Sequence, residues 1–183
     1  MDFLCMDFIN SQWYKTHKTF TDPLKDENWF KNFYLKWNLS FTNIPDKEMI
    51  DRLLELRDFL SCITDNLYAK KTIASKDINK LNEYLKAFSF YKVLKKEQNK
   101  FYLKTIPLKS DLHLIIFEII SSFIDMITKY DIERIKLCEN PDCKWIFYDE
   151  SKSHTRKWCD NTCATLIKVR RFRENKKHGQ IKK

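Results

Sequence analysis

The sequence contains very little glycine and proline: one glycine, Gly179, and four prolines in 183 residues. A phosphate-binding P-loop, a dinucleotide-binding fingerprint and a nucleophile elbow each need several glycines for their backbone geometry, so enzymes built on those motifs are excluded. The shortage of both residue types also favours long helices over glycine-rich β architectures. Because 43% of the residues are hydrophobic and 32% are charged, we expect a globular chain.

Long uninterrupted apolar runs are also absent. The most apolar stretch, residues 112–127, is broken by His113, Glu118 and Asp125, and it is too short and polar to cross a membrane. The first residues lack the basic segment of a secretory signal. We therefore expect a cytoplasmic protein without a membrane partner, in which the six cysteines are core thiols or metal ligands rather than disulfides.

The positive charge is concentrated at one end of the chain. The formal net charge is +9, and residues 152–183 hold 11 basic and two acidic residues, so the remainder is neutral. A neutral body with a basic end predicts a polyanionic partner at that end, or else a solubilising C-terminal tail.

The periodicity of the apolar residues predicts a mainly helical (α+β) fold. After a short apolar element at residues 2–13, helical spacing is found over residues 26–37, 45–70 and 75–88. Two apolar stretches, 90–94 and 101–106, flank a polar segment and predict a β-hairpin. A long apolar helix follows, capped by Ser110 or Asp111 and ending near residue 130. We place a domain boundary near residue 135, which gives a multihelical N-terminal domain, 1–134, and a C-terminal module, 135–183.

Four of the six cysteines form two close pairs in the C-terminal module. Cys138 and Cys143 are followed, after a short insert, by Cys159 and Cys163. Four thiolates in two such pairs suit the tetrahedral shell of a structural Zn²⁺ site with no open position for catalysis. A closed four-thiolate site can also hold iron, and the alternative to a metal site is four ordinary buried thiols.

The insert between the pairs predicts a treble-clef-like module. Residues 145–148 are expected to form a strand, residues 155–158 a returning strand, and residues 159–177 a helix that begins at the second cysteine pair. His154 lies in the polar turn between them and could replace a cysteine, although a turn residue is the simpler interpretation. The remaining cysteines, Cys5 and Cys62, lie in apolar stretches and are predicted to be core thiols.

The predicted C-terminal helix combines an apolar stripe with many cations. Leu166, Val169 and Phe172 recur every three residues and are expected to pack on the zinc module. The cations favour nucleic-acid binding, with a solvated helix end as the plainer alternative. The predicted contact residues are Arg156, Lys157, Lys168, Arg170, Arg171, Arg173, Lys176 and Lys177.

These motifs resemble a known family. The segments 138–149, 156–159 and 168–173 are similar to the CGNR zinc finger, a C-terminal module of bacterial proteins regarded as stress-induced transcription regulators. Residues 4–11 resemble the opening motif of the ABATE domain that precedes this finger. The family takes its name from a Cys-Gly-Asn-Arg run at the last ligand, where this chain has Cys163-Ala-Thr-Leu166.

The resemblance implies a DNA-binding transcription regulator, not an enzyme, with an N-terminal domain that senses a small-molecule effector or forms a homodimer. The competing hypothesis is a zinc-stabilised adaptor that binds protein or structured RNA without reading a DNA sequence. In the N-terminal domain, Asp7 and Asn10 are polar residues within an apolar stretch. They predict either a ligand pocket or a core hydrogen-bond network.

Overall fold

A computed structural model describes residues 1–13, 21–39, 43–108 and 113–180 of the chain. The order of elements matches the expected order: helices first, then a hairpin, a long apolar helix and the cysteine-rich module. In the N-terminal body the helices are α1 (Leu4–Asn10), α3 (Glu27–Lys36), α4 (Lys47–Lys70), α5 (Ser75–Lys86) and α6 (His113–Lys129), with short 3₁₀ turns at Ser11–Trp13 and Pro23–Lys25.

Local capping explains where two of these helices begin. The side chain of Asp26 accepts a hydrogen bond from the amide of Asn28 at the start of α3, and Asp46 does the same for Met49 at the start of α4. Both are N-cap interactions of the kind that satisfies the unpaired amides of a first helical turn. The predicted caps of α6, Ser110 and Asp111, lie outside the described residues.

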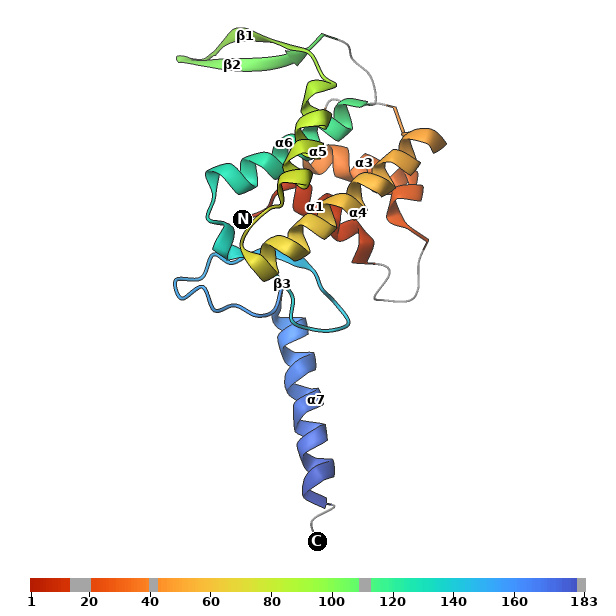
Figure 1. The fold of residues 1–183 in the computed structure, drawn as a ribbon, viewed down its shortest axis with the longest axis vertical. Coiled ribbons are helices and arrows are strands. Elements are labelled where there is room, and N and C mark those ends of the chain that lie inside the picture. Colours follow the sequence, from red (N-terminus) through yellow and green to blue (C-terminus); the bar gives the residue numbers. More distant parts are fainter. Residues whose placement is uncertain (14–20, 40–42, 109–112, 181–183) are drawn as a thin grey trace.

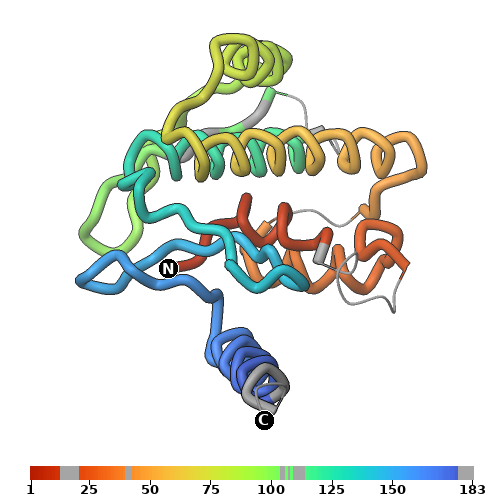
Figure 2. The backbone as a smooth tube through the Cα atoms, turned by 60° about the horizontal axis from the view of Figure 1, so that its bottom comes forward, coloured from red at the N-terminus to blue at the C-terminus, as the bar shows by residue number. Residues whose placement is uncertain are grey.

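The first helix lies at the centre of the body. Most of its residues are buried, which is the pattern of a helix covered on all sides, and it contacts α4, α6 and strand β4. Figure 2 shows α4 and α6 running beside each other on one side of α1. The long helix α4 buries one face, made of Met49, Leu53, Leu56, Leu60, Ile63 and Leu67. Cys62 is exposed, because it lies between the core-facing positions of α4, so the prediction of a core thiol is wrong for Cys62 and correct for Cys5.

Two small antiparallel sheets complete the fold. Strands β1 (Phe90–Glu97) and β2 (Lys100–Pro107) form the predicted hairpin, which projects from the body (Figure 1). Strands β3 (Ile135–Leu137) and β4 (Ile146–Tyr148) pair with each other across the first cysteine pair. The strand predicted at residues 145–148 is therefore present at 146–148, but its partner precedes the cysteines.

The predicted returning strand at residues 155–158 is wrong. This segment is irregular because its main chain bonds elsewhere: the amide of Arg156 donates to the carboxylate of Asp149, and the carbonyl of Lys157 accepts from the amide of Glu139. Helix α7 (Asn161–Gln180) follows and extends away from the body, on the side opposite to the hairpin (Figure 1). No helix in the described ranges has both the length and the apolar character that a membrane span requires.

Candidate metal centre

The four paired cysteines come together at one point. Their Sγ atoms all lie within 4.8 Å of one another, and the Cys143–Cys159 and Cys159–Cys163 sulfur pairs are both 3.7 Å apart. A tetrahedral zinc ion with Zn–S bonds of about 2.3 Å places its sulfurs about 3.8 Å apart. The spacing of the sulfurs therefore fits a four-thiolate zinc site.

The first pair of ligands is held by a tight turn. The carbonyl of Asn140 accepts hydrogen bonds from the amides of Cys143 at 2.9 Å and Lys144 at 3.3 Å. Lys144 adopts a left-handed backbone conformation, with φ of 55°. The side chain of Asn140 is buried and donates to the sulfur of Cys163 at 3.3 Å. One asparagine therefore shapes the turn that carries the first ligand pair and also binds a sulfur of the second.

The second pair lies at the start of α7. Asp160 accepts a hydrogen bond from the amide of Cys163 through its side chain, at 2.8 Å, and caps the helix. Cys163 is thereby placed in the first turn, where the partial positive charge of the helix end favours a thiolate. The helix begins at Asn161, two residues later than the earliest predicted start.

Burial and mutual proximity raise the pKa values of thiols in the cluster. Burial, followed by the charge of Cys138, raises the pKa of the Cys143 thiol to about 12. Burial and then the neighbouring Cys143 also raise the pKa of Cys159. A bound Zn²⁺ would balance the charge of four thiolates in this site. His154 lies in the turn and is not part of the cluster, so the candidate ligand set is the four cysteines.

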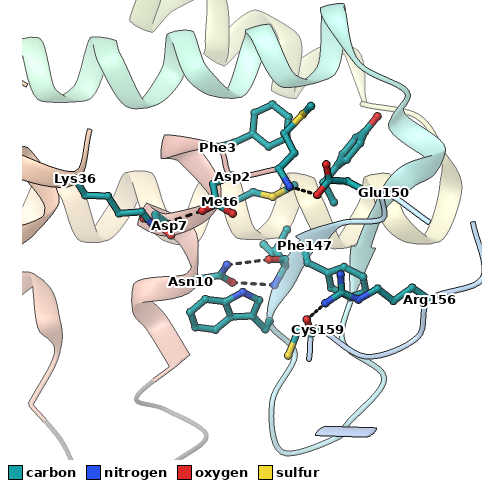
Figure 3. A pocket seen from close by; sticks show the side chains of 14 residues that line it. Asp2, Phe3, Met6, Asp7, Asn10, Lys36, Phe147, Glu150, Arg156 and Cys159 are labelled. Atoms are coloured by element: carbon teal, nitrogen blue, oxygen red, sulfur yellow. Dashed lines mark hydrogen bonds and ion pairs between the residues drawn. The ribbon is translucent and has the colours of Figure 1, made fainter. Parts of the chain in front are cut away.

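The zinc module is joined to the N-terminal body through Asn10. Its side chain donates to the carbonyl of Ile146 at 2.9 Å and accepts from the amide of Ile146 at 2.8 Å (Figure 3). The same strand carries Ile146 and Tyr148 into the hydrophobic core of the body, together with Ile135 of β3. The sheet that bears the first ligand pair is thus part of the body's core.

A cavity of about 270 Å³ lies between α1 and the zinc module. Asp7 and Asn10 line it, and Cys159 and Arg156 line its other side (Figure 3), while binding of a ligand there stays a prediction. Both predicted residues also take part in hydrogen bonding: Asp7 accepts from the indole of Trp37 at 3.0 Å, and Asn10 binds β4. Lining the cavity, as in a ligand pocket, and belonging to a core hydrogen-bond network are therefore compatible for these two residues.

The guanidinium of Arg156 supports the metal site. It donates to the carbonyl of Cys159 and, at 2.9 Å, to that of Trp158, and it lies over the ring of Phe147 at 4.9 Å from the ring centroid. Asp149 is buried, and its side chain accepts from the amides of Ser151 and Arg156. These contacts fix the loop between the ligand pairs. Sequence reasoning missed Asn140 and Asp149, although both are polar residues beside predicted ligands or strands.

The predicted nucleic-acid contacts fall into two groups. Three already have partners: Arg156 as above, Lys157 with Glu139 at 3.3 Å and Arg170 with Asp142 at 2.5 Å. The others on α7 are exposed and form no ion pair with another described residue: Lys168, Arg171, Arg173 and Lys176. Lys177 is on α7, but its side chain lies outside the described part of the chain.

The apolar stripe of α7 does not pack on the zinc module, contrary to prediction. Leu166, Val169 and Phe172 are 45%, 39% and 68% exposed. The helix extends beyond the module after its first turns, so this stripe is left largely exposed (Figure 1). A different face of α7, containing Ile167 and Arg171, borders a groove beside Pro141 and Trp158.

Comparison with known proteins identifies the cysteine-rich module. No curated protein matches the chain. Residues 134–176 match the model of the CGNR zinc finger, a range that includes all four clustered cysteines and most of α7. The resemblance of residues 4–11 to the ABATE domain stays a prediction. Residues 134–176 therefore form a CGNR zinc finger, in which Cys138, Cys143, Cys159 and Cys163 are positioned to bind a zinc ion.

Proposed function

We propose that this protein is a zinc-dependent, DNA-binding transcription regulator of the cytoplasm and not an enzyme. The observation that carries the proposal is a cationic helix that projects from a metal-ordered module. Helix α7 has 20 residues, which corresponds to a length of about 30 Å, and the described cations at 168, 171, 173 and 176 are exposed. A helix of ordinary diameter enters the major groove of B-DNA, which is about 12 Å wide.

Zinc has a structural role in this proposal. Through the ion that they bind, the four thiolates hold three segments in one arrangement: the turn that carries the first cysteine pair, the loop between the pairs and the first turn of α7. The metal thus fixes the direction in which the helix leaves the body. Because the bound ion has four sulfur ligands, it has no open position for water or substrate.

The N-terminal body is the proposed regulatory part. The cavity between α1 and the zinc module, bounded by Asp7, Asn10 and Arg156, touches both parts at once. A small-molecule effector bound there would contact the body and the loop that holds Cys159. Homodimerisation through the body is the other proposed route of control, and sedimentation of the zinc-loaded chain measures it.

A second function has its own support in the shape of α7. Its cations lie on several sides of the helix, and three apolar side chains are exposed between them. A groove-binding helix needs one basic face, whereas this mixture also suits an adaptor that binds protein or structured RNA without base readout.

Selection from random duplex DNA by the zinc-loaded protein distinguishes the DNA-binding regulator from the adaptor. We expect one enriched motif, lost when zinc is chelated, and an affinity that falls steeply with salt. The double variant Arg171→Glu/Arg173→Glu should lower the salt slope by about 2, since each lost phosphate contact removes about 0.9. The control Lys76→Glu/Lys86→Glu changes the charge equally on the exposed surface of α5 and should bind as the wild type does. Uniform affinity for all duplexes would reject the regulator and favour the adaptor.

A further inference from the structure

The β1–β2 hairpin carries an unusual share of the exposed apolar surface. Thirteen large hydrophobic residues are exposed in the described chain, and six of them lie between residues 91 and 108. The hairpin projects from the body at the end opposite to α7, so neither the zinc module nor the basic helix covers it (Figure 1). Exposed apolar clusters of this kind mark interaction sites in soluble proteins.

The register of the hairpin gathers much of this surface on one face. Leu94 pairs with Leu103, and Lys96 pairs with Phe101, so these four side chains point to the same side of the sheet. At the base of that face, Phe90 packs against Phe117 of α6 with ring centroids 4.0 Å apart. Farther out the face is uncovered.

The exposed fractions are 63% for Leu94, 62% for Leu103 and 66% for Phe101. We call these three residues, with Lys92 and Lys96 of the same face, the outer hairpin face. This face begins next to Phe90, which packs on the body, and extends outward from there.

Both edges of the hairpin are open to pairing. The sheet has two strands, and no third strand joins it within the described residues. Each edge therefore presents main-chain N–H and C=O groups that an added strand could bind. A two-stranded sheet is marginally stable alone, so an added strand would also stabilise it.

The positive charge of the hairpin favours an acidic partner. Its described lysines, Lys92, Lys95, Lys96 and Lys100, are all exposed, while its carboxylate, Glu97, accepts a hydrogen bond from the hydroxyl of Tyr102 at 2.7 Å. A second copy of the chain would bring like charges together across the new edge. A partner that offered only phosphate groups would neutralise the lysines but would leave the leucines exposed, so it fits this surface less well.

We propose that the hairpin is a docking site for an extended, acidic and apolar segment of a partner protein, which adds as a strand along β1. The sequence of β1 defines the pattern of that segment. On the free edge of β1, the residues of the added segment that face Lys92, Val93, Leu94, Lys95 and Lys96 would be acidic, apolar, apolar, acidic and acidic, in that order. Main-chain hydrogen bonds would supply affinity, and these side-chain pairs would supply specificity. The site is independent of the zinc module and its proposed function.

A labelled peptide tests the site directly. The probe is a fluorescein-labelled decapeptide with Glu-Glu-Leu-Val-Glu at its centre, which matches β1 in antiparallel orientation, and binding to the zinc-loaded full chain is followed by fluorescence anisotropy. We expect saturable binding that weakens with salt, together with increased hydrogen-exchange protection of the β1 amides. Replacing the apolar residues of the probe with proline removes main-chain donors and should abolish binding.

Variants of the chain locate the site. Leu94→Ser/Leu103→Ser should weaken binding about tenfold or more, because two buried apolar contacts are lost. Leu35→Ser, at a side chain 80% exposed on α3, is the matched control and should leave affinity unchanged. The helix variant Arg171→Glu/Arg173→Glu should also bind the peptide normally, which separates this site from the nucleic-acid proposal.

Three results would overturn the proposal. The first is equal binding of the proline probe or no effect of the leucine variant, because charge alone would then explain the affinity. The second is self-association of the wild-type chain in sedimentation that the leucine variant removes, which would assign the hairpin to a second copy. The third is binding to phosphatidylserine vesicles without binding to the peptide, which would assign it to a membrane surface.

Discussion

Replacing Asn10 with alanine should destabilise the whole protein by about 2–3 kcal/mol. The side chain makes two buried hydrogen bonds, of 2.9 and 2.8 Å, with both main-chain groups of Ile146. Each buried group left without a partner costs about 1–3 kcal/mol. Two such groups sum to about 2–6 kcal/mol. We expect a value at the lower end of this sum because Asn10 also lines the cavity, from which water can reach the freed groups. For a chain of this size the loss corresponds to a fall in Tm of about 5–10 °C.

The assay is urea unfolding of the zinc-loaded protein followed by far-ultraviolet circular dichroism. Asn82→Ala is the control, since Asn82 is an exposed residue of α5 and should change stability by less than about 0.5 kcal/mol. The variant Asn10→Asp sharpens the test. It keeps an acceptor for the amide of Ile146 but turns a carboxylate oxygen toward the carbonyl, so it should be at least as destabilising as alanine at pH 7. If Asn10→Ala were no more destabilising than the control, the link between α1 and β4 would not be stabilising.

Three further predictions concern buried and titratable groups. Iodoacetamide should modify only the exposed Cys62 of the zinc-loaded chain, and it should also modify the four clustered cysteines after chelation. Burial raises the pKa of Cys5 to about 12, so Cys5 should react only after unfolding. Mass spectrometry counts the labels in each state. Arg57→Leu should cost about 3–5 kcal/mol in the same urea assay, because it leaves the carboxylate of Asp22 buried without its guanidinium partner, and a loss below about 1 kcal/mol would contradict this. Burial raises the pKa of Glu118, so the folded protein loses stability as the pH rises through the pKa of Glu118 in the folded state. The variant Glu118→Gln should therefore be more stable than the wild type at pH 7. This difference in the free energy of unfolding should vanish below about pH 4.5.

The elements that the sequence predicted well are those with strong local signals. Helix α4 has both an Asp46 cap and a regular apolar face, and the hairpin shows a clear change of period at Phe90. The zinc ligands were predictable because four thiols in two pairs have a specific chemistry. In these cases neighbouring residues contain the physical cause of the structure.

The features that were missed depend on distant partners. Strand β4 pairs with β3 because Ile135 and Ile146 share the body's core, and nothing in the cysteine spacing indicates this. The exposure of Phe172 depends on the direction in which α7 leaves the module. The backbone conformation of some turn residues was missed for another reason: Gln98, Lys144 and His154 all have positive φ, and no glycine marks these positions in the sequence.

The Asn10–Ile146 connection also constrains synthesis of the chain. The two residues are 136 positions apart, so at about 5–20 residues per second the ribosome needs roughly 7–27 s to make the second after the first. During that time α1, which is apolar around nearly its whole circumference, lacks the strand that it contacts in the finished protein. We expect the nascent chain to present this helix to chaperones until strand β4 has emerged and packed against it.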